Sequence, residues 1–156
     1  SGEFFLPQLL QAASAAQAAC AVINERLRRD SAAAQSKPVV IATVKGDIHD
    51  IGKNIAGSLL RNYGYEVVDL GKDVPPQEVV DAARRTGARL VGLSALMTTT
   101  TPAMRETVRA IREAGLACRV MVGGAVVTGD FARSIGADYY VKDAKASVDA
   151  AKEVYR

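Results

Sequence analysis

The sequence predicts an α/β fold in which five parallel strands alternate with helices. Residues 39–44 form an unbroken apolar run, which is typical of a strand buried on both faces of a parallel sheet. Four further short apolar runs follow, and segments with helical apolar spacing separate them. Because a helix between two strands returns the chain for parallel pairing, this alternation favours a flavodoxin-like (Rossmann-like) sheet with helices on both faces.

The first part of the chain is predicted to be a helix that precedes this domain. In residues 6–28 the leucines and alanines recur near helical spacing, and Pro7 suits a first helical turn. Residues 31–37 are small and polar, which is typical of a linker. We therefore expect the α/β domain to cover residues 38–156.

Within that domain the elements follow one another in strict alternation. The expected strands cover residues 39–44, 66–70, 90–93, 119–122 and 138–141, and the expected helices cover residues 52–63, 76–86, 102–114, 129–135 and 144–155. The carboxyl ends of parallel strands meet at one edge of a sheet, where this class of fold binds its ligands. The loops that follow the strands are therefore the place to look for chemistry.

Composition excludes several classes of protein. The 156 residues fit one domain with a short appendage. The 20 basic and 17 acidic residues leave a net charge of +3, and they do not cluster as in a nucleic-acid-binding face. No apolar run reaches the roughly 18 residues of a membrane span, and the N-terminus does not resemble a signal peptide. Cys20 and Cys118 lie far apart, so we expect both to be reduced and the protein to be cytoplasmic.

Three of the loops after strands carry polar or glycine-rich sequence. They are residues 45–54, 94–101 and 123–125, and the first of them holds His49, the only histidine of the chain. A neutral imidazole binds a metal through one nitrogen, and its other N–H needs an acceptor, which Asp47 could supply. Hydroxyls in the run of threonines at 98–101 could extend that network by bonding the carboxylate.

One histidine and one aspartate cannot hold a bare metal ion, because a structural zinc site needs four protein ligands. The metal should therefore arrive inside its own macrocycle and need one axial ligand. Taken singly, each motif also has an ordinary explanation. A lone loop histidine needs no ligand, Gly123-Gly124 can serve a tight turn, and threonines before Pro102 can cap a helix. A flavodoxin-type or receiver-like domain without a cofactor is the corresponding alternative.

The motifs in combination resemble the signature of cobalamin-binding domains. That signature is carried by Asp47-x-His49-x-x-Gly52, Ser94-x-Leu96 and Gly123-Gly124, in this order and at similar spacing. Residues 40–54 look like the version found in methionine synthase and in small corrinoid proteins of methyltransferase systems. The resemblance covers residues 38–156. Residues 2–8 resemble part of the helical cap over the upper corrin face, which implies that residues 1–30 are the last part of such a cap, with Phe5 as a candidate contact.

The resemblance implies a cobalamin or related corrinoid bound base-off, with His49 as the lower axial cobalt ligand. Asp47 and Thr100 would complete a triad with this histidine. The nucleotide tail would enter a slot beside Gly123 and Gly124, and Ser94 would bond its base. The residues expected to contact the cofactor are Gly46, Asp47, Ile48, His49, Asp50, Gly52, Ser94, Leu96, Thr98, Gly123, Gly124 and Ala144.

The function that the resemblance implies is methyl transport. The corrinoid would take a methyl group from a donor, become methylcobalamin or its equivalent, and pass the group to an acceptor. A catalytic methyltransferase barrel does not fit into 156 residues, so methyltransferase domains or subunits would be the partners, and the chain would not be catalytic alone. No nucleic acid or membrane is expected among the partners. The alternatives are the cobalamin module of a methionine synthase and, in another class, an adenosylcobalamin-dependent mutase subunit or a cobalamin-based sensor.

Overall fold

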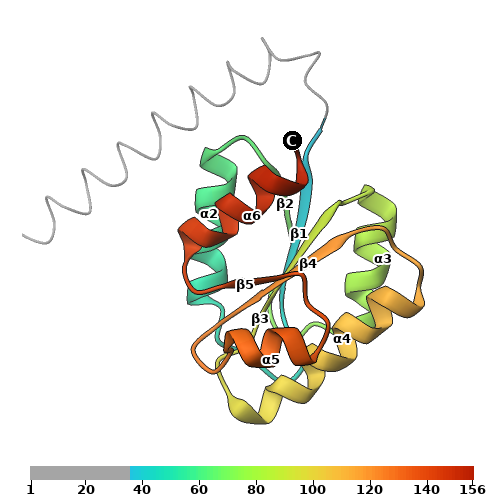
Figure 1. Ribbon diagram of the computed structural model, residues 1–156, viewed down its shortest axis with the longest axis vertical. Helices are drawn as coiled ribbons and strands as arrows, with labels where there is room; N and C mark the ends of the chain where they lie inside the picture. The colour runs from blue at the N-terminus through green and yellow to red at the C-terminus, as the bar shows by residue number, and fades with distance from the viewer. Residues whose placement is uncertain (1–35) are drawn as a thin grey trace, which may run out of the picture. The chain divides into compact units, whose positions relative to one another are not determined.

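The computed structural model describes residues 36–156 (Figure 1). The predicted N-terminal helix and cap, together with Cys20 and Phe5, lie outside the described residues. The division of the chain at residues 30 and 37 stays a prediction.

Five parallel strands form the sheet, as the alternation predicts. They are β1 (Pro38–Thr43), β2 (Glu66–Asp69), β3 (Leu90–Ser94), β4 (Arg119–Gly123) and β5 (Tyr139–Val141). The strand order is β2-β1-β3-β4-β5, and every neighbouring pair is parallel. This is the flavodoxin-like order, in which the direction of winding reverses between β1 and β3. The predicted fold class is confirmed.

The helices also follow the prediction, with ends that differ by at most one residue. The difference that concerns the site is the run of threonines, where a 3-10 turn leads directly into the next helix. Pro102 suits that helix start because its ring fixes φ and its missing N–H is not needed there. The helical elements are α2 (Ile51–Asn62), α3 (Pro76–Thr86), η1 (Thr98–Thr100), α4 (Thr101–Glu113), α5 (Gly129–Ser134) and α6 (Ala144–Val154).

The sheet separates two apolar cores because alternate strand residues point to opposite faces. On β1, Val40 and Ala42 join the core under α3, α4 and α5, whereas Val39 and Ile41 join the core under α2 and α6. Figure 1 shows α2 and α6 together on one side of the sheet and α3 and α4 on the other. Side chains such as Leu60 are completely buried, and burial of this kind contributes about 1.5–3 kcal/mol for each large aliphatic residue.

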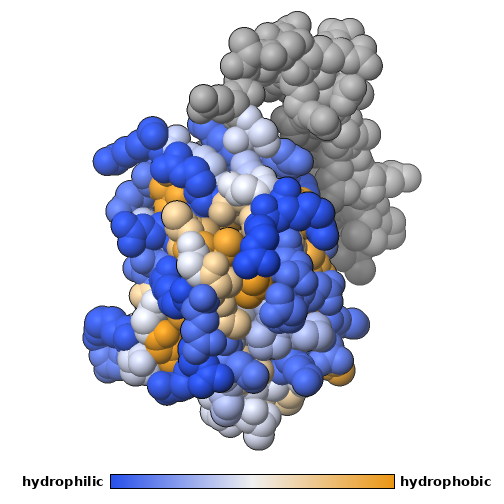
Figure 2. Space-filling view, turned by 90° about the vertical axis from the view of Figure 1, so that its right-hand side faces the viewer, coloured by the Kyte–Doolittle hydropathy of each residue, from blue (hydrophilic) through white to orange (hydrophobic). Residues whose placement is uncertain are grey.

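The face seen in Figure 2 is mostly hydrophilic, with apolar residues reaching the surface in a narrow strip. Among the described residues, no helix has the length and hydropathy to cross a membrane.

The strand ends bring the polar loops together. Thr43, Ser94 and Gly123 are paired across β1, β3 and β4, so the loops that follow these three strands start from one row of the sheet. The predicted gathering of the loops at one edge is therefore present in the structure.

Candidate functional site

The loop after β1 turns sharply so that Asp47 points into the protein. Gly46 has a φ of +84°, which glycine adopts without the steric cost that a side chain would bring. The Asp47 N–H donates to the carbonyl of Val44 at 3.0 Å and closes the turn. Asp47 is completely buried, whereas the neighbouring Ile48 is exposed.

The Asp47 carboxylate is surrounded by hydrogen-bond donors. Its Oδ1 accepts from the backbone N–H of His49 at 3.0 Å and lies 2.9 Å from His49 Nδ1. Its Oδ2 accepts from the backbone N–H groups of Leu96 at 2.7 Å and Met97 at 3.2 Å. The Thr100 hydroxyl lies 2.8 Å from the same oxygen. The carboxylate therefore joins the loop after β1 to the loop after β3.

The Thr100 hydroxyl has two acceptors within reach but one proton. Its Oγ1 lies 2.8 Å from both the Asp47 carboxylate and the carbonyl of Met97. The charged oxygen is the stronger acceptor, so the proton is assigned to the bond with Asp47. Thr100 is the N-cap residue of α4, yet its side chain makes no capping hydrogen bond. Its hydroxyl donates to the Asp47 carboxylate instead.

The hydrogen bonds keep Asp47 ionised. Burial by itself raises the pKa of this carboxyl, but the bonds from His49, Leu96 and Thr100 outweigh it and hold the pKa well below the usual range. A carboxylate can only accept, so Nδ1 of a neutral His49 carries the proton, and its Nε2 keeps a lone pair. This tautomer follows from the hydrogen-bond partners. The side chain of His49 is 46% exposed, so Nε2 is available to a ligand.

Apolar side chains surround the imidazole at the surface. Ile48, Ile51 and Leu96 are exposed to 61%, 76% and 41% of their full area. Ile48 and Ile51 are close to His49 in the sequence and Leu96 lines a cavity with it, and exposed apolar residues of this kind are typical of binding surfaces. Within residues 36–156 there is no group of three or more His, Cys, Asp or Glu side chains that could hold a metal ion.

A cavity of about 490 Å³ lies next to His49, on the α2 and α6 side of the sheet. Six of the other predicted site residues line this cavity together with His49: Gly52, Ser94, Leu96, Gly123, Gly124 and Ala144. The other six do not line it: Gly46, Asp47, Ile48, Asp50, Thr98 and Thr100. Asp47 contacts both the His49 ring and the Thr100 hydroxyl, so the three residues of the predicted triad are connected. Ser94 Oγ lies 3.0 Å from Thr43 Oγ1, so this hydroxyl already has a partner within the protein.

The floor of the cavity is formed by residues that the motifs did not identify. Ile41, Gly92 and Met121 are paired across β1, β3 and β4, and all three line the cavity. Each precedes a residue of the row Thr43, Ser94 and Gly123 by two positions. The alternation of a strand places residues i and i+2 on the same face, so this signal was present in the sequence.

The two adjacent glycines are required by the fold itself. A Cβ on Gly123 would lie 2.6 Å from the carbonyl oxygen of Val141, in β5. Gly124 has a φ of +125°, and a Cβ there would lie 1.9 Å from the carbonyl oxygen of Ala95. The close-packing explanation of this motif therefore holds, and the same two residues also line the cavity.

Comparison with known proteins identifies the domain. The family described as B12 binding domain matches residues 37–151. Dimethylamine corrinoid protein 3 of Methanosarcina mazei is 41% identical over 98% of this chain and 93% of its own length.

Two solved structures extend the comparison. The monomethylamine corrinoid protein of Methanosarcina barkeri has a TM-score of 0.72 and 32% identity, over 97% of this chain and 73% of that one. A chain of the methanol:cobalamin methyltransferase complex MtaBC from the same organism has a TM-score of 0.77 and 35% identity. The match covers 97% of this chain and 58% of that chain. The resemblance that the motifs indicated is thereby confirmed. The chain belongs to the B12-binding domain family, and its cofactor is a corrinoid.

Proposed function

We propose that this chain carries methyl groups on a base-off corrinoid whose lower axial ligand is His49. The observation that supports this most directly is the buried Asp47 carboxylate, which lies 2.9 Å from Nδ1 of an otherwise exposed imidazole. A carboxylate in this position fixes the ring orientation and the tautomer, and it makes the other nitrogen a better metal ligand. A histidine without such a role would have no need for this arrangement.

The residues present fit a corrinoid. The exposed Ile48, Ile51 and Leu96 offer an apolar surface beside the imidazole, against which the macrocycle would lie. The cavity of about 490 Å³ falls within the range of ligand sites and would hold the nucleotide tail. Ser94 and Ala144 line it with small side chains.

The cofactor supplies the reactive cobalt, which accepts a methyl group from a donor and yields it to an acceptor. The protein's residues supply position and charge. Asp47 holds a proton on Nδ1 of His49 and leaves Nε2 free to bind the metal. Thr100 and the backbone N–H groups of Leu96 and Met97 hold Asp47 in place.

The partners would be methyltransferase subunits. The similar proteins named above are a dimethylamine and a monomethylamine corrinoid protein and a chain of a methanol:cobalamin methyltransferase complex. The identity to the dimethylamine protein is 41%, against 35% for the chain of the methanol system, so we infer that a methylated amine is the source of the methyl group. His49 and the residues around it belong to the domain that is matched in all three relatives.

An electron paramagnetic resonance experiment tests the ligand. Protein labelled with ¹⁵N is reconstituted with unlabelled hydroxocobalamin and reduced to Co(II). A nitrogen from the protein splits each cobalt line into two, whereas the unlabelled benzimidazole of the cofactor splits it into three. We expect each cobalt line to be split into two in the wild type and in Lys45→Ala, an exposed control in the same loop. We expect this two-line splitting to be absent in His49→Ala. Three lines in the wild type would show that the cofactor keeps its own base.

A further inference from the structure

The loop between β2 and α3 runs alongside the loop that carries Asp47 and His49. The Thr43 N–H donates to the carbonyl of Gly71 at 2.9 Å, and the Val74 N–H donates to the carbonyl of Thr43 at 3.1 Å. An isolated parallel bridge joins Val44 to Val74. The pairing of β1 with β2 is thus continued beyond the end of both strands, up to the residues that precede Asp47.

Asp73 bonds the two peptide groups that flank the one between Gly46 and Asp47. Its carboxylate Oδ1 accepts from the Gly46 N–H at 2.7 Å, and its own N–H donates to the Asp47 carbonyl at 3.0 Å. The first of these bonds involves a charged acceptor, which makes it stronger than a neutral bond. The two contacts fix both ends of a short segment in which Gly46 already has an unusual φ.

The backbone of Asp73 is itself in an unfavourable conformation. With a φ of +56°, it is the one non-glycine residue between 36 and 156 that has a positive φ. Residues other than glycine adopt this region at a steric cost, which aspartate bears better than most, and they keep it where surrounding contacts require it. The contacts here are the two bonds to Gly46 and Asp47.

Asp47 is therefore held from two directions. Its side chain is fixed by His49, Leu96, Met97 and Thr100, while its main chain is fixed by Asp73. The direction of its carboxylate depends on both, because a shift of the main chain on either side of Asp47 would move the carboxylate away from its donors.

We propose that Asp73 is a positioning residue for the axial ligand of the corrinoid. It acts through the main chain of Asp47, and so determines how the His49 imidazole is presented to the metal. This inference rests on the proposed function. It assigns a role in cofactor ligation to a loop that carries none of the motifs and does not line the cavity.

Two substitutions separate this role from a general effect on folding. Asp73→Gly removes the carboxylate but tolerates the positive φ, so the backbone strain is relieved while the bond to Gly46 is lost. Asp73→Asn keeps an oxygen acceptor and also tolerates this φ. Lys72→Gly is the matched control, because Lys72 is an exposed neighbour in the same loop.

The measurement is the ¹⁵N-split fraction of the Co(II) spectrum at one fixed pH, together with the thermal midpoint of the apoprotein. Partners of metal-binding residues typically affect metal affinity by about 10–100-fold, and a residue one step further out should do less. We expect Asp73→Gly to weaken His49 ligation by about two- to tenfold. Asp73→Asn and Lys72→Gly should stay close to wild type, and the apoprotein midpoint of Asp73→Gly should match that of Lys72→Gly.

Two results would overturn the inference. One is an equal split fraction in Asp73→Gly and Lys72→Gly. The other is a loss of ligation in Asp73→Gly that accompanies a lower apoprotein midpoint and is not rescued in Asp73→Asn, since this would show a purely structural role. A wild type without ¹⁵N splitting would remove the proposed function as well, so the two failures are distinguishable.

Discussion

At the scale of single residues, Asp47 connects the fold to the proposed chemistry. It is a completely buried carboxylate without a basic side chain of Lys or Arg among its partners; backbone N–H groups, the His49 ring and the Thr100 hydroxyl surround it. Leaving such a group without its bonds would be costly, so the loops after β1 and β3 must keep their arrangement. The residue that would orient the metal ligand is thus also one that holds the site together.

Replacing Asp47 with Asn keeps the shape of the side chain and removes its charge. We expect the corrinoid to stay bound through the cavity, while His49 ligation weakens by about 10–100-fold. Thr100→Ala should act in the same direction and less strongly, because it removes one of several donors to the carboxylate. The ¹⁵N-split fraction of the Co(II) spectrum measures both effects.

Thr101→Ala provides the control for Thr100. The Thr101 hydroxyl bonds the carbonyl of Thr98 and does not reach Asp47. A split fraction in Asp47→Asn equal to that of the wild type would mean that the carboxylate is not coupled to the ligand, even with His49 established as the ligand.

At the scale of secondary-structure elements, α2 forms one wall of the cavity. Lys53 in its first turn is buried, and its Nζ donates to Asp69 at 2.5 Å and to Asn54 at 2.8 Å. Asp69 ends β2 and also accepts from the Gly71 N–H at 2.9 Å. This ion pair therefore ties the start of α2 to the end of the strand that leads into the Asp73 loop.

Gly52 on α2 offers a direct test of the cavity. A Cβ at this position would meet no atom within 4 Å, so a side chain there would extend into the space that Gly52 lines. We expect Gly52→Leu to lower corrinoid affinity by about tenfold or more, which corresponds to about 1.4 kcal/mol. The apoprotein should gain up to about 1 kcal/mol of stability, since leucine favours a helix more than glycine does.

Titration of the apoprotein with the corrinoid, followed by its visible spectrum, measures that affinity. Ser58→Leu is the control, because Ser58 is exposed on the same helix and does not line this cavity. Equal affinities for the two variants would place the cofactor elsewhere. Gly123 is less suited to this purpose, because a side chain there would collide with β5 and disturb the sheet.

The elements that the sequence predicted well are those whose pattern is local. Apolar runs and helical spacing located every strand and helix of residues 38–156 to within about two residues at most of their ends, apart from the 3-10 turn at Thr98–Thr100. In that turn the Thr100 hydroxyl contacts Asp47, which is 53 positions away, and no local pattern could reveal this contact.

The prediction of the site has a similar limit. His49 and Asp47 were predicted from a recognisable motif and Thr100 from the family resemblance, and the structure brings these three together. The alternation of the strands could have placed Gly92 and Met121 on the face of Ser94 and Gly123, but that the two lie side by side follows only from the register of the sheet. Asp73 could be identified only from the three-dimensional path of a loop that has no motif, and its positive φ is likewise visible only in the structure.

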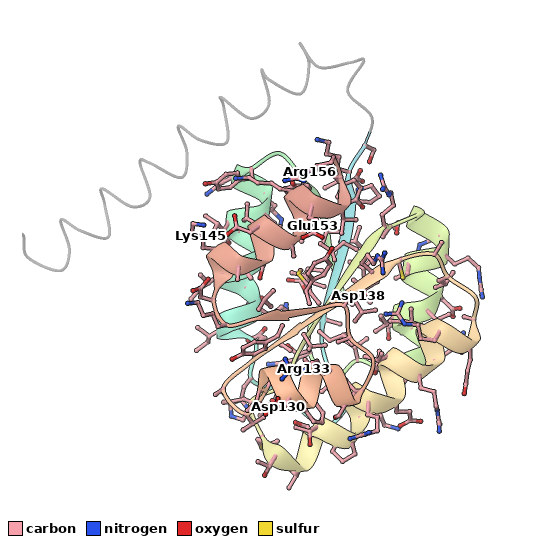
Figure 3. The ribbon with its side chains drawn as sticks, in the orientation of Figure 1. Asp130, Arg133, Asp138, Lys145, Glu153 and Arg156 are labelled. Carbon is pink, nitrogen blue, oxygen red and sulfur yellow. The ribbon has the colours of Figure 1, made fainter. Side chains whose placement is uncertain are left out.

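At the scale of the whole molecule, Asp138 joins elements at the β5 edge of the sheet (the residue is labelled in Figure 3). Its carboxylate accepts from Arg112 of α4 at 2.6 Å, and from the Arg119 side chain and the Val120 N–H of β4 at 2.8 and 2.7 Å. Arg112 also donates to the carbonyls of Cys118 and Gly136. The edge strand β5 is thereby attached to α4 and β4 just before it begins.

This network should make stability depend on acid. Burial raises the pKa of Asp138, but the bonds from Arg112, Val120 and Arg119 outweigh that effect and leave the pKa lowered. A carboxyl whose pKa is lower in the folded state stabilises the fold above its unfolded pKa of about 3.9, and this contribution is lost as the pH falls through the folded pKa. We expect Asp138→Asn to cost about 1–3 kcal/mol near pH 7, since a partly buried acceptor loses its charge, and to cost less and less below about pH 4. Chemical denaturation of the apoprotein between pH 3 and pH 7 measures the difference.

Asp149→Asn is the control, because Asp149 pairs with Lys145 on the surface, where such a pair contributes about 0–1 kcal/mol. A gap between wild type and Asp138→Asn that stays constant over the whole pH range would show that the network stabilises the edge of the sheet by shape and not by charge.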